Sequence, residues 1–248
     1  MSGTSLSILY DNAVEITSKN PEVIVNMDKI IRAPKFISFM NSLDHNTIII
    51  KKIEIFNATW FCAPQMIAPE KLGFLYLNVI CTDKDNTPLP GIVFLRGSAV
   101  SVLIIVEIDG KEYVLLTKQI RVPGGKTFLE IPAGMLDGSG NFAGKMADEI
   151  KEETSLVVNV NKLCQLGEPI YPSPGGCDEA IQLYLWKTSI TSEKMQELLN
   201  KIHGNIDEHE KINLTFIPLE EFDQQLSSQI SDVKAICARL RSYQILGH

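Results

Sequence analysis

The chain has 248 residues, of which 45% are hydrophobic, so it is long and apolar enough to bury one large core or two small ones. Its net charge of −7 and the lack of a long basic run exclude a polyanion such as nucleic acid as the expected partner. No secretory signal, no stretch of eighteen apolar residues and no C-x-x-C pair is found, which favours a cytoplasmic protein with reduced cysteines and no contact with a membrane.

The N-terminal half predicts mainly strands. Residues 1–45 predict a short strand or two and a helix around residues 29–43. Alternating β-branched and aromatic residues then predict strands at 47–61, 71–83 and 90–97. Residues 98–122 predict a hairpin of two apolar strands about an Asp109–Gly110 turn.

Helices enter the pattern after an apolar stretch at 127–136. Phe142, Met146 and Ile150 recur at helical spacing, which predicts a helix from Asn141, a plausible cap, to Thr154. The remaining elements are expected as strands at 156–160, 180–190 and 210–219, a helix at 192–204, and a C-terminal helical region at 219–243 with Ile230, Val233, Ile236, Cys237 and Leu240 on one face.

The helix at 141–154 ends in a cluster of acids. Residues three and four apart share a helix face, so Glu149, Glu152 and Glu153 present three carboxylates within one turn. One interpretation is an ordinary solvated face. The other is a hard-cation site, because magnesium prefers oxygen ligands and binds through one or two carboxylates with water and phosphate.

The acid cluster and the loop before it resemble the Nudix hydrolases, whose motif is G-x5-E-x7-R-E-U-x-E-E-x-G-U with U a bulky aliphatic residue. Gly134 and "EIKEETSL" match its two ends. The resemblance implies an α+β fold, a Nudix α/β/α sandwich with a mixed sheet over residues 93–248. It is preceded by a β-rich N-terminal region over residues 1–92, expected to serve dimerisation and to supply a platform for the substrate.

Three positions depart from this motif. Its first glutamate corresponds to Gly140, its arginine to Asp148 and its late glycine to Ser155. The exchange of arginine for Asp148 adds repulsion among the acids, which would raise their pKa values. Lys145, one turn before Glu149, is a possible substitute for the missing cation.

Residues outside the motif resemble one branch of the family. "KQIRVPGGKTFLEIPAGMLD" and "YPSPGGCDEAIQLYLW" are similar to enzymes that cleave ADP-ribose and nucleotide sugars, most of all the plant ADP-sugar diphosphatases. The likeness covers about residues 90 to 220. It implies hydrolysis of ADP-glucose or ADP-ribose to AMP and a sugar phosphate by a homodimer. A hydrolase of UDP- or GDP-sugars and a non-catalytic nucleotide-binding module, spoiled by Asp148, are the alternatives.

The same resemblance assigns site residues. It implies that Mg2+, or Mn2+, is held by Glu149, Glu152 and Glu153 with the carbonyl of Ala133 or Gly134, and that Glu153 is also catalytic. A metal-activated water is then the nucleophile, which leaves no such role for Cys177.

Substrate-binding residues and a general base are implied as well. Arg121 could equally be a surface cation and Glu130 a strand-end acid. Trp60 could serve core packing, and the charged run at residues 207–210 could simply be a solvated loop. The substrate-binding residues implied are Arg121, Glu130, Gly134, Arg96 and Trp60, and the bases, in order, are Glu210, Glu208 and His209.

Overall fold

The computed structural model describes residues 6–10, 14–136, 142–204 and 211–246. The backbone contacts divide the chain into two units. Unit 1 runs to Ser98 and also includes the segment Tyr171–Ala180, while unit 2 begins at Ala99 and holds the other described residues. The boundary predicted at residue 92 falls on the first residue of a strand, Ile92–Leu95, that lies wholly within unit 1.

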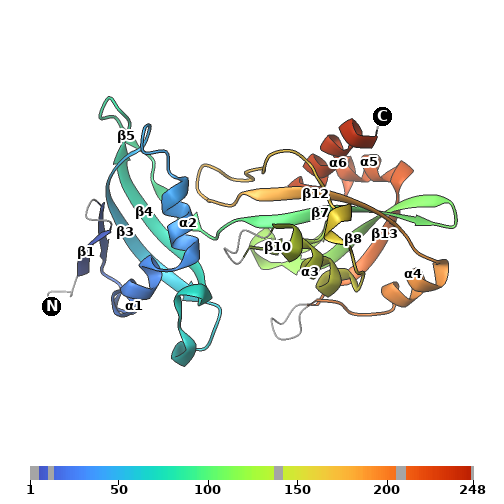
Figure 1. Ribbon diagram of the computed structural model, residues 1–248, viewed down its shortest axis with the longest axis horizontal. Helices are drawn as coiled ribbons and strands as arrows, with labels where there is room; N and C mark the ends of the chain where they lie inside the picture. The colour runs from blue at the N-terminus through green and yellow to red at the C-terminus, as the bar shows by residue number, and fades with distance from the viewer. Residues whose placement is uncertain (1–5, 11–13, 137–141, 205–210, 247–248) are drawn as a thin grey trace. The chain divides into compact units, whose positions relative to one another are not determined.

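Unit 1 is a six-stranded sheet with two helices (Figure 1). The sheet order is β1-β2-β3-β4-β5, with β6 also paired to β4, and only β2 and β3 are parallel. The strands are β1 (Leu6–Tyr10), β2 (Val14–Ser18), β3 (Ile49–Trp60), β4 (Leu72–Thr82), β5 (Pro88–Leu89) and β6 (Ile92–Leu95).

The helices of unit 1 are α1 (Pro21–Ile31) and α2 (Pro34–Ser42), where the sequence predicted one helix. Asn20 begins α1 because its side chain accepts the backbone N–H of Glu22. Proline cannot continue a helix in its interior, so Pro34 starts a new helix instead of extending α1. Both helices bury apolar residues against one face of the sheet.

Unit 2 is a mixed sheet in the order β11-β12-β7-β8-β13, with β10 paired to β7 and β9 to β8. Only the β12–β7 pair is parallel. Asp109 and Gly110 both have positive φ, at 50° and 78°, as the predicted hairpin turn requires. The strands are β7 (Ala99–Ile108), β8 (Lys111–Arg121), β9 (Lys126–Glu130), β10 (Ala133–Met135), β11 (Cys164–Gln165), β12 (Ile181–Ser189) and β13 (Asn213–Pro218).

Helices cover both faces of the unit 2 sheet. Residues of α3 (Phe142–Thr154) and α4 (Ser192–Leu199) share one core cluster with the strands. Residues of α5 (Leu219–Ser228) and α6 (Val233–Leu246) share the other. The predicted α/β/α sandwich with a mixed sheet is therefore confirmed. Short 3₁₀ turns occupy Pro64–Met66, Pro69–Lys71, Val122–Gly124 and Val160–Lys162.

Two predictions for unit 2 are wrong, the second only in part. Residues 156–160 form no strand: Leu156 and Val158 are buried beside α3, but β12 takes β11 as its antiparallel neighbour instead. The predicted face of the C-terminal region is packed only in part, because Ile230 and Cys237 lie in or against the core while Leu240 is 67% exposed. α6 also packs through Ala235 and Ala238, whose small side chains allow a close approach to the sheet.

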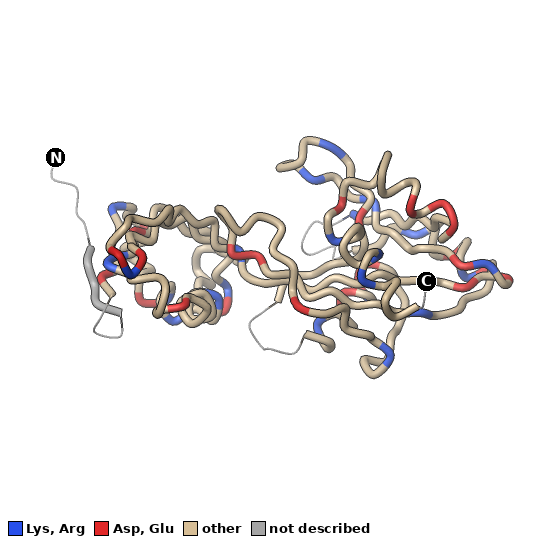
Figure 2. The backbone as a smooth tube through the Cα atoms, turned by 90° about the horizontal axis from the view of Figure 1, so that it is seen from above, with Lys and Arg blue, Asp and Glu red and all other residues tan. Residues whose placement is uncertain are grey.

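Charged residues of both signs are distributed along both units, as Figure 2 shows. None of the helices that the structure describes is both long and apolar enough to span a bilayer. All five cysteines are free.

Candidate active site

The turn between β9 and β10 is held by hydrogen bonds along its length. The backbone N–H of Ile131 donates to Asp232 Oδ2 at 3.0 Å. The Pro132 carbonyl accepts from Ser101 Oγ at 2.8 Å, and the Ala133 N–H donates to Glu153 Oε2 at 3.1 Å. The "EIPAG" stretch is therefore fixed to the start of α6, to β7 and to α3.

Glu153 is the buried member of the acid cluster. Its side chain lies on the inner face of α3, and besides the Ala133 N–H it accepts Gln119 Nε2 at 3.3 Å. Each of the two carboxyl oxygens therefore accepts a hydrogen bond. The predicted catalytic residue is thus fixed between β8 and β10.

Glu149 lies directly over Gly134. A Cβ atom placed on Gly134 would be 1.9 Å from Glu149 Cδ, so only glycine leaves room for this carboxylate. Gly134 has ordinary backbone angles, which makes space and not φ the reason for glycine here. Glu152, on the same turn of helix, is exposed.

The donors in this region fit a hard cation by their chemistry, since they are carboxylates beside a backbone turn. Within the described residues, however, no three His, Cys, Asp or Glu side chains are grouped closely enough to hold an ion. The ligand set of Glu149, Glu152, Glu153 and the Ala133 carbonyl stays a prediction.

Lys145 supplies a cation that the motif would take from an arginine. Its Nζ lies 2.7 Å from Glu149 Oε1, one helical turn away, while Asp148 is exposed. Burial alone would lower the pKa of Lys145, but the hydrogen bond and charge of Glu149, with the charges of Glu152 and Asp148, raise it above its usual value. Lys145 therefore remains a cation.

Ser155 adopts the left-handed conformation, with φ 56°, at the motif position of a glycine. Its Oγ lies 3.1 Å from Nδ1 of His203 and accepts Lys201 Nζ at 3.1 Å. The His203 Nε2 lies 2.9 Å from the Leu198 carbonyl, and because a carbonyl only accepts, Nε2 is the donor of this hydrogen bond. The hydrogen bonds of Ser155 to His203 and Lys201 offset part of the free-energy cost of its left-handed backbone conformation.

Arg121 and Glu130, both predicted to contact substrate, contact each other. Arg121 Nε and Nη2 donate to the two Glu130 oxygens at 2.8 and 3.1 Å. Burial would raise the pKa of Glu130, but the Arg121 hydrogen bond and the charges of Lys234 and Arg121 hold it below its usual value. The structure therefore brings these two residues together as an ion pair.

Lys234 and Asp232 join this pair and were missed in the sequence. Lys234 Nζ lies 3.1 Å from Glu130 Oε2 and 2.8 Å from Asp232 Oδ1. Asp232 precedes α6 and accepts the Lys234 N–H, so its preference for helix starts could have revealed it. Lys234 had no such signal, because its partner is 104 residues away.

Arg96 belongs to unit 1 and is held by the "GGCDE" loop. Its backbone N–H donates to Asp178 Oδ1 at 2.7 Å, the Gly97 N–H donates to the same carboxylate, and its Nη1 lies 3.3 Å from Glu179 Oε1. Trp60, also in unit 1, is partly buried against the core, and its role as a platform stays a prediction. Burial raises the pKa of the Cys177 thiol, which disfavours a thiolate nucleophile.

The candidate bases Glu208, His209 and Glu210 lie outside the described residues. On either side of that stretch, His203 and Ile212 exchange backbone hydrogen bonds of 2.9 Å.

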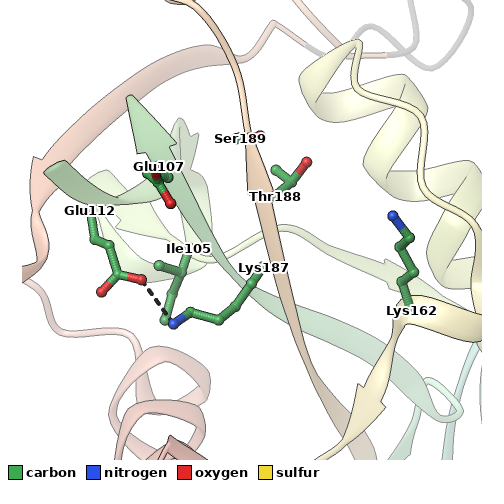
Figure 3. Close-up of a pocket in the computed structure, with 7 residues that line it drawn as sticks. All are labelled: Ile105, Glu107, Glu112, Lys162, Lys187, Thr188 and Ser189. Carbon is green, nitrogen blue, oxygen red and sulfur yellow. Dashed lines mark ion pairs between the residues drawn. The ribbon is translucent and has the colours of Figure 1, made fainter. Parts of the chain in front are cut away.

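A cavity of about 350 Å³ lies elsewhere on unit 2, at the ends of β7 and β12 (Figure 3). The Lys187 ammonium in its wall is paired with Glu112 at 2.8 Å. It shares no residue with the predicted site, whose β10 strand pairs with the opposite end of β7. Its lining residues are Ile105, Glu107, Glu112, Lys162, Lys187, Thr188 and Ser189.

Comparison with curated proteins finds similarity to Nudix hydrolases. The chain is 40% identical over 162 residues to Nudix hydrolase 14, chloroplastic, of Arabidopsis thaliana, over 61% of this chain and 52% of the relative, so it matches about half that protein's length. It is 30% identical over 147 residues to an uncharacterized Nudix hydrolase of Schizosaccharomyces pombe, over 59% of this chain and 68% of the relative. It is 30% identical over 141 residues to ADP-ribose pyrophosphatase of Bacillus subtilis, over 56% of this chain and 69% of the relative.

Among solved structures, the fold is similar to that of an ADP compounds hydrolase. The TM-score is 0.52 at 15% identity, over 80% of this chain and 96% of the other. This likeness supports the fold alone. No protein-family model matches the chain.

Proposed function

The chain belongs to the Nudix hydrolase family, and from this premise we propose that it hydrolyses the diphosphate of an ADP-sugar, ADP-glucose or ADP-ribose, to AMP and a sugar phosphate. One observation carries the proposal: the buried Glu153 carboxylate is fixed by the Ala133 N–H beside Gly134, with Glu149 above that glycine. The relative named ADP-ribose pyrophosphatase supports the substrate class.

The chain's own residues have separate roles in this proposal. Glu149, Glu152 and Glu153 would hold Mg2+, or Mn2+, with the Ala133 carbonyl. When bound, the ion supplies positive charge against the diphosphate and lowers the pKa of water. Arg121 orients the phosphates, while Arg96 and Trp60 are proposed contacts to the rest of the substrate. Glu210, or Glu208, is proposed to accept the proton of the attacking water.

A second candidate is a non-catalytic module that binds nucleotides. Two observations favour it: Asp148 stands where the motif has an arginine, and the acids of the described chain are not gathered into a closed metal site. The pairing of Lys145 with Glu149 argues for the enzyme, since a cation beside the acids is retained.

The test is release of AMP from a panel of nucleoside diphosphate sugars with and without Mg2+. We expect Mg-dependent release from ADP-sugars, and a loss of about 100-fold or more in kcat for Glu153→Gln. Glu197→Gln, which changes an exposed acid of α4, is the matched control and keeps full activity. Faster cleavage of UDP- or GDP-sugars would change the nucleobase assigned to the substrate. Tight ADP-ribose binding without turnover would establish the binding module instead.

We also propose a homodimer, formed through the face of the unit 1 sheet that lies opposite α1 and α2. Phe56, Tyr76, Ile92 and Phe94 are each between 40% and 48% exposed there. The rings of Phe56 and Tyr76 are 5.1 Å apart, and Tyr76 lies opposite Phe94 across the strands. Such a continuous apolar strip is typical of an interface. Light scattering should show a dimer for the wild type and a monomer for Tyr76→Glu. A monomeric wild type would refute the proposal.

The proposed compartment is the cytoplasm, which the five free cysteines support. Expression of a fluorescent fusion and cell fractionation would test it.

A further inference from the structure

Lys234, in the first turn of α6, contacts Glu130 of the predicted substrate-binding pair, and Asp232, just before α6, contacts Lys234. Lys234 is an ion-pair partner of both Glu130 and Asp232. The side chains of Lys234, Glu130 and Asp232 are only 14%, 8% and 3% exposed. Asp232 also accepts the backbone N–H of Ile131, within the turn that leads to Ala133 and Gly134. The start of α6 thus reaches both the side chain and the backbone of the candidate site.

The two cations on Glu130 differ in their exposure. Arg121 is 42% exposed, whereas Lys234 is almost fully enclosed. Arg121 uses Nε and Nη2, one edge of its guanidinium, to bind both oxygens of Glu130. A two-pronged contact through this particular edge can go to Glu130 or to a phosphate, but not to both at once.

A carboxylate left without a cation in a buried position carries a large desolvation cost. If Arg121 turned to a diphosphate in the absence of Lys234, Glu130 and Asp232 would be two buried acids with no positive partner. With Lys234 in place, Glu130 keeps one cation at 3.1 Å whichever partner Arg121 binds.

We propose that Lys234 is a positioning residue that keeps Glu130 charged and in place while Arg121 exchanges Glu130 for the diphosphate of the substrate. Asp232 completes the arrangement, because it holds the Lys234 ammonium with one oxygen and the Ile131 N–H with the other. The substrate in this statement rests on the proposed function, whereas the interdependence of Lys234, Glu130 and Arg121 does not.

The first experiment needs no substrate. The free energy of unfolding is measured in urea for Arg121→Met, Lys234→Met and the double variant. Each single variant leaves Glu130 one cation, so the double variant should lose more stability than the sum of the singles. In a Glu130→Gln background this excess should vanish, because no carboxylate remains to be compensated. If the losses of the two single variants simply add while Glu130 is present, the proposal is overturned.

The second experiment measures kcat and KM for the ADP-sugar. Lys234→Met should raise KM about tenfold and change kcat less than about threefold, because binding must now strip Glu130 of its last cation. Lys234→Arg should return KM to near the wild-type value. Lys194→Met, which removes the exposed Lys194–Glu197 pair, is the control and should leave KM unchanged. A purely structural role would lower the active fraction without moving KM, and that result would overturn the proposal. If the wild type turns over no nucleotide sugar, the proposed function fails, and the unfolding cycle still decides whether Lys234 holds Glu130.

Discussion

At the scale of single residues, Gly134 shows how a missing side chain can shape a site. Replacing it with alanine places a methyl group where the Glu149 carboxylate now lies. Because Glu149 contacts this glycine through the end of a flexible side chain, Gly134→Ala should fold and displace the carboxylate. A misplaced group of this kind costs about 100-fold in rate. We therefore expect kcat/KM for the ADP-sugar to fall by about that factor, with little change in the thermal midpoint.

The matched control is Gly175→Ala, since a Cβ at Gly175 meets no atom within 4 Å. Full activity in Gly134→Ala would show that Glu149 does not need its present position.

Ser155 allows a second prediction about a residue in the left-handed conformation. A non-glycine residue in this conformation costs about 1 kcal/mol, and a hydrogen bond contributes about as much. Ser155→Ala keeps the strain and removes one of the two side-chain hydrogen bonds of the buried His203, so it should destabilise the protein by about 1–2 kcal/mol. Ser155→Gly loses the same bonds but relieves the strain, so it should be the more stable variant of the two. Urea unfolding of both variants measures the difference, and a more stable alanine variant would contradict this account.

At the scale of elements, local patterns predicted most of the fold. The β7–β8 hairpin followed from alternation and an Asp–Gly turn, and α3 followed from its spacing and acids. The segment 156–160 was mistaken for a strand because alternating burial does not reveal whether a strand has a partner. α6 was misread because Ala235 and Ala238, which pack, carry weaker hydrophobic signals than the exposed Leu240.

The candidate site was predictable only where its residues are close in the sequence. Glu149, Glu153 and Gly134 carry a motif, so their neighbourhood could be recognised. Lys234 contacts Glu130 only because the fold brings α6 to the end of β9. No local sequence pattern reveals a contact between residues 104 positions apart.

The α5–α6 pair gives a prediction about pH. The Arg239 guanidinium holds the pKa of Asp223 below its usual value, with a further hydrogen bond from Tyr243. A depressed folded pKa contributes stability that is fully present above the ordinary aspartate pKa and disappears as the pH falls through the folded value. Because Asp223 is 47% exposed, the contribution is about 0.5–1 kcal/mol after solvent screening.

Unfolding free energies of the wild type and Asp223→Asn should therefore differ at pH 7 and converge in acid, as the pH falls below the ordinary aspartate pKa of about 4 and through the lower folded value. A difference that persists unchanged in acid would mean that the pair does not titrate as described.

At the scale of the whole molecule, the two units have separate cores. The unit 1 cluster includes the fully buried Ile53, and the unit 2 clusters include the fully buried Leu103. Truncating either side chain to alanine removes about 2–5 kcal/mol from its own core. Hydrogen exchange should then show lower protection of β3 and β4 in Ile53→Ala, and of β7 and β8 in Leu103→Ala. If either substitution lowered hydrogen-exchange protection equally in both units, the two units would unfold as one.

The loop Tyr171–Ala180 belongs to unit 1 although both sequence segments that flank it belong to unit 2. Asp178 in this loop binds the backbone at Arg96 and Gly97, and the Phe94 N–H donates to Gly176. A single crossover near residue 98 would therefore pair this loop with a foreign N-terminal half in place of the residues it binds at 94–97. An exchange that preserved these bonds would have to include Tyr171–Ala180 as a second piece.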